Sequence, residues 1–132
     1  MKRYVAMINT DEDDRDITEA VLAETGMDIS MKFLADANEL YAAMGVEGAP
    51  LIILLNDTGA AYKGYDDLRQ LRTDPSSSHI PVIVLGEVST EDYIREYYRA
   101  GANSFVTKPS MVAETKKKME LFFNYWFNVA EC

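Results

Sequence analysis

The sequence predicts an α/β fold in which five parallel strands form one doubly wound sheet with five helices on its two faces. Strand-like and helix-like patterns alternate along all 132 residues,. The apolar run Leu51 to Leu55 is typical of a strand that is buried on both faces,. No internal repeat or low-complexity tract interrupts the alternation. We therefore expect one domain over residues 1–132, with strand order 2-1-3-4-5.

The first half of the chain contains three predicted strands and two predicted helices, each marked by apolar spacing and by glycine or proline at its ends. They are a strand at 3–8, a helix that includes residues 17–21 and runs to Gly26, a weaker strand at 27–34, a helix at 37–44 that is closed by Gly45 to Gly48, and a strand at 51–55 that is opened by Pro50.

The second half repeats this order after a predicted loop at 59–64,. It contains a helix through Tyr65, Leu68 and Leu71, a breaker at 74–78, a strand at 82–85, a capping box at 89–92 that starts a helix ending at Gly101, a strand at 104–107, and a last helix from about Met111,.

Composition and charge exclude several classes of function. The net charge of −9 and the isoelectric point of about 4.5 argue against nucleic-acid binding, which needs clustered Lys and Arg,. No apolar stretch approaches the roughly 20 residues of a membrane span. The only cysteine, Cys132, excludes an internal disulfide, and the lone His79 has no partners for a zinc site,. We expect a soluble, cytoplasmic protein.

Polar side chains follow the predicted strands at the edge where open α/β sheets place their sites. These residues are Asn9, Thr10 and Asp11 after the first strand, Asn56 and Asp57 after the third, Gly86 after the fourth, and Lys108 after the fifth.

Four segments give the chain a resemblance to a known family: 11–15, 50–55, 80–85 and, most strongly, 101–109, which reads GANSFVTKP. They resemble the receiver domain of bacterial two-component response regulators, and among receivers the small stand-alone type that partners phytochromes. The resemblance implies a flavodoxin-like fold and a signalling role in a phosphorelay, not an enzyme.

In that family an aspartate on the third strand accepts a phosphoryl group from a histidine kinase, and an acidic pair after the first strand holds Mg²⁺. Counting from Pro50 and from Gly64 places Asn56 at the acceptor position. The acidic pair falls on Asn9 and Thr10, and Asp11 matches a third acidic residue. The hydroxyl residue that contacts the phosphoryl group falls on Gly86. Only the phosphate-contacting lysine, Lys108, and the switch aromatic, Phe105, remain.

These replacements predict a degenerate site. A carboxamide has no anionic oxygen to attack phosphorus, so Asn56 cannot form an acyl phosphate. Mg²⁺ prefers carboxylate oxygens, and we expect it to bind weakly or not at all, with no other cofactor. The sequence therefore predicts a pseudo-receiver that acts through protein–protein interaction.

Two alternatives stay open. In the first, Asp57 or Asp11 rescues Mg²⁺-dependent phosphorylation. Side chains alternate along a strand, so we expect Asp57 to face away from Asn56 unless a bulge shifts the register, and we expect Asp11 to cap the first helix or pair with Lys108. In the second, the altered pocket senses a small molecule.

An aromatic surface is the predicted contact for a partner, which is a histidine kinase, another regulator or a second copy of the chain. The resemblance places it on the fourth helix, the fifth strand and the last helix. Its candidate residues are Tyr93, Tyr97, Tyr98, Leu121, Tyr125 and Phe127,. The simpler interpretation is that these tyrosines only cover the edge of the hydrophobic core.

Overall fold

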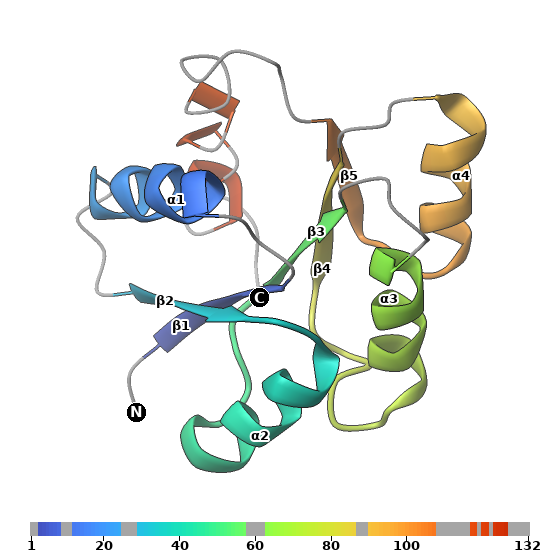
Figure 1. Ribbon diagram of the computed structural model, residues 1–132, viewed down its shortest axis with the longest axis horizontal. Helices are drawn as coiled ribbons and strands as arrows, with labels where there is room; N and C mark the ends of the chain where they lie inside the picture. Colours follow the sequence, from blue (N-terminus) through green and yellow to red (C-terminus); the bar gives the residue numbers. More distant parts are fainter. Residues whose placement is uncertain are drawn as a thin grey trace.

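Five parallel strands form the single sheet of the computed structural model, in the order β2-β1-β3-β4-β5 (Figure 1). The structure describes residues 3–8, 12–24, 29–57, 63–86, 90–107, 117, 118, 120, 121 and 123–126. The elements along the chain are β1 (Arg3–Ile8), α1 (Glu12–Glu24), β2 (Ile29–Leu34), α2 (Ala37–Glu47), β3 (Ile53–Asp57), α3 (Lys63–Thr73), β4 (Val82–Gly86), α4 (Glu91–Arg99) and β5 (Ser104–Thr107).

Helices lie on both faces of this sheet. In Figure 1, α1 and the red C-terminal helical segment lie on one side, and α2, α3 and α4 lie on the other. By C-terminal helical segment we mean the described residues from 117 to 126, which are helical. The predicted α/β class and strand order are confirmed. Of the five predicted helices, the structure establishes four with continuous bounds, because the last one is described only in part.

Most element boundaries lie close to their predicted positions. β1 and β5 have the predicted bounds, whereas β3 begins and ends two residues later than the apolar run suggested. Asn56 and Asp57 therefore belong to the strand and pair with β4, opposite Leu85 and Gly86. Apolar patterning does not reveal this extension, because polar side chains at a strand's carboxyl end interrupt the pattern while the backbone pairing continues.

The core consists of two apolar clusters, one on each face of the sheet. Side chains alternate along β3, so Ile53 and Leu55 pack in the cluster with α2, α3 and α4, and Leu54 packs in the other,. Phe123 of the C-terminal helical segment is fully buried in that second cluster. Because both faces are buried, a slip of one residue in β3 would exchange the two sets of side chains.

Two helix starts differ in how they are capped. The Asp36 carboxylate accepts a hydrogen bond of 2.9 Å from the amide of Glu39, and the Glu39 carboxylate accepts one of 3.3 Å from the amide of Ala35,. At α4 the cap residue is Thr90, and its side chain makes no cap hydrogen bond. Ser89, with which the capping box predicted at 89–92 begins, lies outside the described residues, so that capping box stays a prediction.

Arg72, near the end of α3, joins this helix to the loop before β4 and to the turn between α4 and β5. Its guanidinium donates hydrogen bonds to the carbonyl oxygens of Ser78 (3.1 Å), Ile80 (2.8 Å) and Gly101 (2.7 Å), and also to the side-chain oxygen of Asn103. Gly101 has a φ of 109°, and a Cβ there would lie 2.8 Å from Cγ of Arg72. The turn between α4 and β5 therefore needs glycine at this position.

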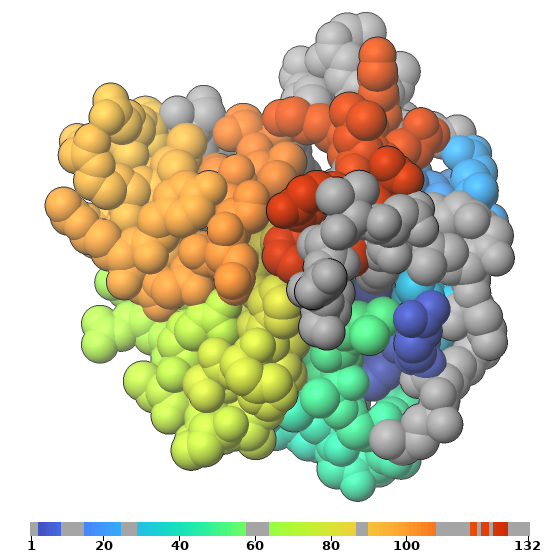
Figure 2. Space-filling view, turned by 180° about the vertical axis from the view of Figure 1, so that it is seen from behind, coloured from blue at the N-terminus to red at the C-terminus, as the bar shows by residue number. Residues whose placement is uncertain are grey.

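None of the helices within the described ranges is long and apolar enough to cross a membrane. From behind, α4, β5 and the C-terminal helical segment occupy adjoining parts of the surface, coloured orange to red in Figure 2.

Candidate functional site

The carboxyl end of β3 carries the two residues on which the predicted site depends. Both are buried, with Asn56 2% exposed and Asp57 1% exposed. β3 and β4 pair residue for residue from Ile53 to Asp57, so no bulge shifts the strand,. Asn56 therefore shares a face with Leu54, and Asp57 shares the opposite face with Leu55.

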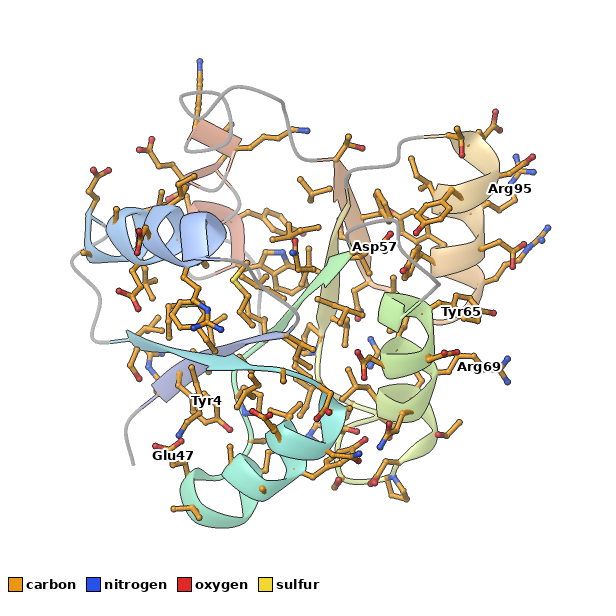
Figure 3. All side chains as sticks on the ribbon, in the orientation of Figure 1. Tyr4, Glu47, Asp57, Tyr65, Arg69 and Arg95 are labelled. Atoms are coloured by element: carbon orange, nitrogen blue, oxygen red, sulfur yellow. The ribbon has the colours of Figure 1, made fainter. Side chains whose placement is uncertain are left out.

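Asp57 lies on the face covered by α3 and α4 (Figure 3). A Cβ at Gly64 would lie 3.5 Å from Cβ of Asp57 and 2.8 Å from the hydroxyl oxygen of Tyr97. Glycine at the start of α3 thus leaves room for both side chains. The prediction that Asp57 faces away from Asn56 is confirmed.

Four other members of the predicted site lie outside the described residues. Asn9, Thr10 and Asp11 directly follow β1 in the sequence, and Lys108 directly follows β5. Their roles stay predictions. Among the described parts of the chain, no group of three His, Cys, Asp or Glu side chains could hold a metal ion.

The aromatic ring of Phe105 lies directly over Gly86. A Cβ on Gly86 would overlap this ring, approaching its Cε1 to 2.8 Å and its Cε2 to 3.1 Å. The amide of Phe105 donates a hydrogen bond of 3.1 Å to the hydroxyl oxygen of Tyr98. The space that a side chain at position 86 would need is therefore occupied by the ring of Phe105.

Tyr97 is a buried residue of α4 that lies close both to Asp57 and Gly64 and to Phe105. It is 1% exposed, and its ring centroid lies 5.6 Å from that of Phe105 and 5.5 Å from that of Tyr93. Burial raises the pKa of Tyr97 far above its usual value, and the negative charge of Asp57 raises it further,. The hydroxyl thus stays protonated beside the Asp57 carboxylate.

The burial of Tyr97 corrects the predicted interface. Tyr97 packs in the core, and Tyr93 is half-buried against it. The two residues are one helical turn apart, so they share the inner face of α4, whereas Tyr98 is exposed on the outer side,. Tyr93 and Tyr97 are spaced by four residues, which is the spacing of a core-facing stripe on a helix. This spacing could have indicated core packing, although large aromatic residues are also common at interfaces.

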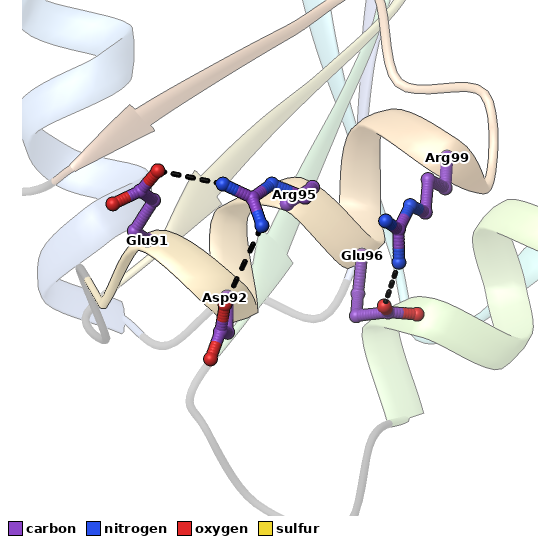
Figure 4. Close-up of polar contacts among 5 residues, drawn as sticks. All are labelled: Glu91, Asp92, Arg95, Glu96 and Arg99. Carbon is purple, nitrogen blue, oxygen red and sulfur yellow. Dashed lines mark hydrogen bonds and ion pairs between the residues drawn. The ribbon is translucent and has the colours of Figure 1, made fainter.

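The surface beside β5 keeps three of the six predicted contact residues. Tyr98, Leu121 and Tyr125 are exposed, Leu121 by 63%. Phe127 lies outside the described residues. Charged side chains of α4 flank this surface, and Figure 4 shows Arg95 paired with Glu91 at 2.6 Å and Arg99 paired with Glu96 at 2.9 Å. Lys118 donates a hydrogen bond of 2.6 Å to the carbonyl oxygen of Thr107, at the end of β5.

We expect the free energy of unfolding to fall above about pH 10, because the unfolded chain then ionises Tyr97 at its ordinary pKa of 10.0 while the folded chain keeps it protonated,. The contribution of a raised pKa is present below pH 10 and is lost as the pH rises, by about 1.4 kcal/mol per pH unit. Urea denaturation at several alkaline pH values measures this slope. Tyr97→Phe should make the dependence of the unfolding free energy on pH shallower by the equivalent of one proton, which is about 1.4 kcal/mol per pH unit. The same pH dependence in the variant and the natural chain would contradict the environment described for Tyr97.

Comparison with known proteins agrees with the fold. The family model described as the response regulator receiver domain matches residues 5–120. The chemotaxis protein CheY of Pseudomonas aeruginosa is 37% identical over 60 residues, which are 46% of this chain and 48% of that protein. CheY-3 of Vibrio cholerae is 31% identical over 61 residues, covering 46% and 47%. The chain thus matches about half the length of these curated relatives.

Solved structures resemble the chain over nearly all of its length. The phosphorylated cyanobacterial phytochrome response regulator RcpA has a TM-score of 0.88 at 20% identity, covering 99% of this chain and 98% of that one. The Mn²⁺-bound response regulator Rcp1 has a TM-score of 0.85 at 21% identity, covering 98% and 97%. Identities this low establish the fold alone. The family match over residues 5–120 shows that this chain belongs to the response regulator receiver domains of two-component signalling.

Proposed function

We propose that this receiver acts without phosphorylation, as a protein-interaction module in two-component signalling. One observation carries the proposal. The acceptor position is occupied by the buried amide Asn56, while the neighbouring carboxylate, Asp57, lies on the opposite face of the sheet.

The chemistry of phosphoryl transfer supports this proposal. An acceptor must present an anionic oxygen to phosphorus, and the reaction is helped mainly by positioning and by neutralisation of charge. Asn56 lacks the anionic oxygen. Asp57 has one, but it is 1% exposed beneath α3 and α4, beside Tyr97. A phosphoryl donor at the rim of the sheet does not reach it without unpacking this part of the core.

The set of metal donors does not fit Mg²⁺. A magnesium site in a receiver needs carboxylate oxygens at the ends of β1 and β3, because the ion is hard and gives up its water reluctantly. The chain offers the neutral residues Asn9, Thr10 and Asn56 there, with Asp11 as the acid after β1, while Asp57 lies on the opposite face of the sheet from Asn56. We therefore expect metal binding to be weak, and no step of the proposed function depends on it.

Glycine at position 86 also holds the ring of Phe105 in one position. Glycine at position 86 leaves space for the ring, and a side chain at that position would overlap it. A receiver switches when a phosphoryl group biases two arrangements of this region. Here the ring already occupies the space beside β4, so the surface near β5 keeps one conformation.

The partner then binds a surface of constant shape. Tyr98, Leu121 and Tyr125 expose apolar and aromatic area over α4 and the C-terminal helical segment, and such residues are enriched at interface centres,. A second copy of the chain suits this surface, because Lys117 and Lys118 of one copy can meet acidic side chains of α4 in the other. A histidine kinase or another regulator would use the same residues.

Intact-mass measurement after incubation with acetyl phosphate and Mg²⁺ tests the proposal. We expect no phosphoryl adduct on the natural chain, whereas the combined variant Asn9→Asp, Thr10→Asp, Asn56→Asp should gain one, because it restores the acceptor and the metal ligands that the family uses. A phosphorylatable receiver in the same reaction controls for the donor. An adduct on the natural chain would overturn the proposal.

A further inference from the structure

A pocket opens between the first turns of α3 and α4, on the face of the sheet opposite Asn56. Its volume is about 260 Å³. It is lined by three tyrosines, two carboxylates and one hydroxyl residue: Tyr65, Tyr93, Tyr97, Asp92, Glu96 and Thr90. Most pockets for drug-sized ligands hold roughly 300–1,000 Å³, so this one suits a single small group.

The three tyrosine rings enclose this pocket from different directions. Tyr97 forms the floor, and the ring of Tyr65 meets it edge to face, with centroids 6.0 Å apart and an angle of 70°. Tyr93 meets it at 5.5 Å and 60°. Rings that stand at steep angles around one space present both faces and edges to it. Aromatic faces are electron-rich, and such enclosures attract cations that have lost part of their hydration shell.

Acidic side chains add negative potential to the same pocket. Asp92 and Glu96 are one helical turn apart on α4 and both line it,. Their partners are Arg95, whose guanidinium lies 3.7 Å from Asp92, and Arg99 on Glu96 (Figure 4). All four side chains are exposed, and ion pairs of this kind contribute little, so a cation in the pocket can compete with them,.

A buried charge behind the pocket strengthens the preference for a positive ligand. The buried carboxylate of Asp57 lies behind Tyr97, and its charge contributes to the raised pKa of that phenol. On the α3 side, the guanidinium of Arg69 lies 5.9 Å from the ring centroid of Tyr65. Arg69 is not among the residues that line the pocket, so this guanidinium contacts Tyr65 without entering the pocket.

We propose that this tyrosine cage, formed by Tyr65, Tyr93 and Tyr97 with the acidic rim of Asp92 and Glu96, binds a small organic cation, an alkylated ammonium or a guanidinium. The cation is a free small molecule or the tip of an arginine side chain on a partner protein. An anion is repelled by the rim, and a neutral ligand of the same shape lacks the electrostatic attraction to the ring faces and to the rim. This inference does not depend on the loss of phosphorylation, because it uses the other face of the sheet.

Binding can be followed by NMR of the full chain with carbon-labelled tyrosine rings. The probes are choline, a blocked arginine amide, and dimethylbutanol, which is the neutral isostere of choline. We expect a saturable shift of the Tyr65 and Tyr93 ring signals with at least one cation, and none with the alcohol. Choline alone points to a free ligand, and the arginine amide alone points to a partner's side chain. Equal shifts with dimethylbutanol, or no saturable shift with either cation, would overturn the proposal.

Two variants locate the site. Glu96→Gln should weaken cation binding roughly two-fold, while Glu19→Gln on α1, which changes the net charge equally, should leave it unchanged. Tyr93→Leu keeps apolar bulk but removes one ring face and should weaken binding roughly two- to five-fold. Circular dichroism confirms that each variant is folded. Equal effects of Glu96→Gln and Glu19→Gln would mean that the cation binds through net charge and not in the cage.

Discussion

Gly86→Ala is expected to lower the free energy of unfolding by about 2 kcal/mol, although it adds a single methyl group. The added Cβ overlaps the Phe105 ring, approaching its Cε1 to 2.8 Å. That ring also contacts the buried Tyr97, so it has little room to yield on the core side. Alanine is the better residue for a strand interior, and this gain offsets part of the overlap. Urea denaturation at neutral pH measures the net change.

The matched control is the same substitution in a different environment. Gly45 lies inside α2, and no atom lies within 4 Å of a Cβ added there. Gly45→Ala should therefore stabilise the protein by roughly 0.5–1 kcal/mol. Phe105→Ala should remove most of the cost of Gly86→Ala, because the two positions compete for one space. If Gly86→Ala were as harmless as Gly45→Ala, the Phe105 ring would not be confined to the space that glycine leaves free at position 86.

Arg72→Met is expected to lower the free energy of unfolding by about 3 kcal/mol. The guanidinium donates to three carbonyl oxygens and to the side chain of Asn103, and hydrogen bonds to a charged group contribute about 1.5–3 kcal/mol each when buried,. The expected loss of about 3 kcal/mol is well below the sum of these four contributions, because Arg72 is half-buried and water replaces part of the lost hydrogen bonding,. Chemical denaturation of the variant measures the loss.

The geometry of the lost bonds makes this prediction specific. The side-chain oxygen of Asn103 also accepts a hydrogen bond of 2.9 Å from the amide of Val82, so Arg72 supports the start of β4 as well as the turn before β5. Arg72→Lys should recover only part of the stability, because an ammonium cannot span acceptors this far apart. Arg99→Met removes an exposed surface pair and should change stability by less than 0.5 kcal/mol,. A similar loss from Arg99→Met would show that charge, not the bonding of Arg72, is responsible.

The fold could be predicted because its signals are local. Apolar runs and helical spacing located every strand, and the alternation of the two implied a parallel sheet and its strand order,. The late end of β3 was missed, since Asn56 and Asp57 pair through their backbones while their side chains look like loop residues. Ordinary strand geometry then placed these two on opposite faces, because the period of a strand is two.

Only one part of the site, the residue at position 56, could be predicted from the sequence, because its identity alone determines whether it has an anionic oxygen. Counting from Pro50 and Gly64 pointed to Asn56, and the structure places this residue, buried, near the carboxyl end of β3. The loss of phosphorylation stays a prediction. The contact of Phe105 with Gly86, the burial of Tyr97 and the cage around it were not predictable, because they depend on how α4 packs against β4 and β5. Such long-range contacts leave no periodic signal in a single chain.

NMR signals of the Phe105 ring, recorded with and without beryllofluoride and Mg²⁺, test most directly whether the receiver is fixed in one state. We predict a single set of ring signals with unchanged shifts and a ring contact to the Gly86 α-protons in both samples, because the site has neither an acceptor carboxylate nor carboxylate pairs for the ion,. A shifted ring signal, or a contact to Gly86 that appears only with beryllofluoride, would contradict this account.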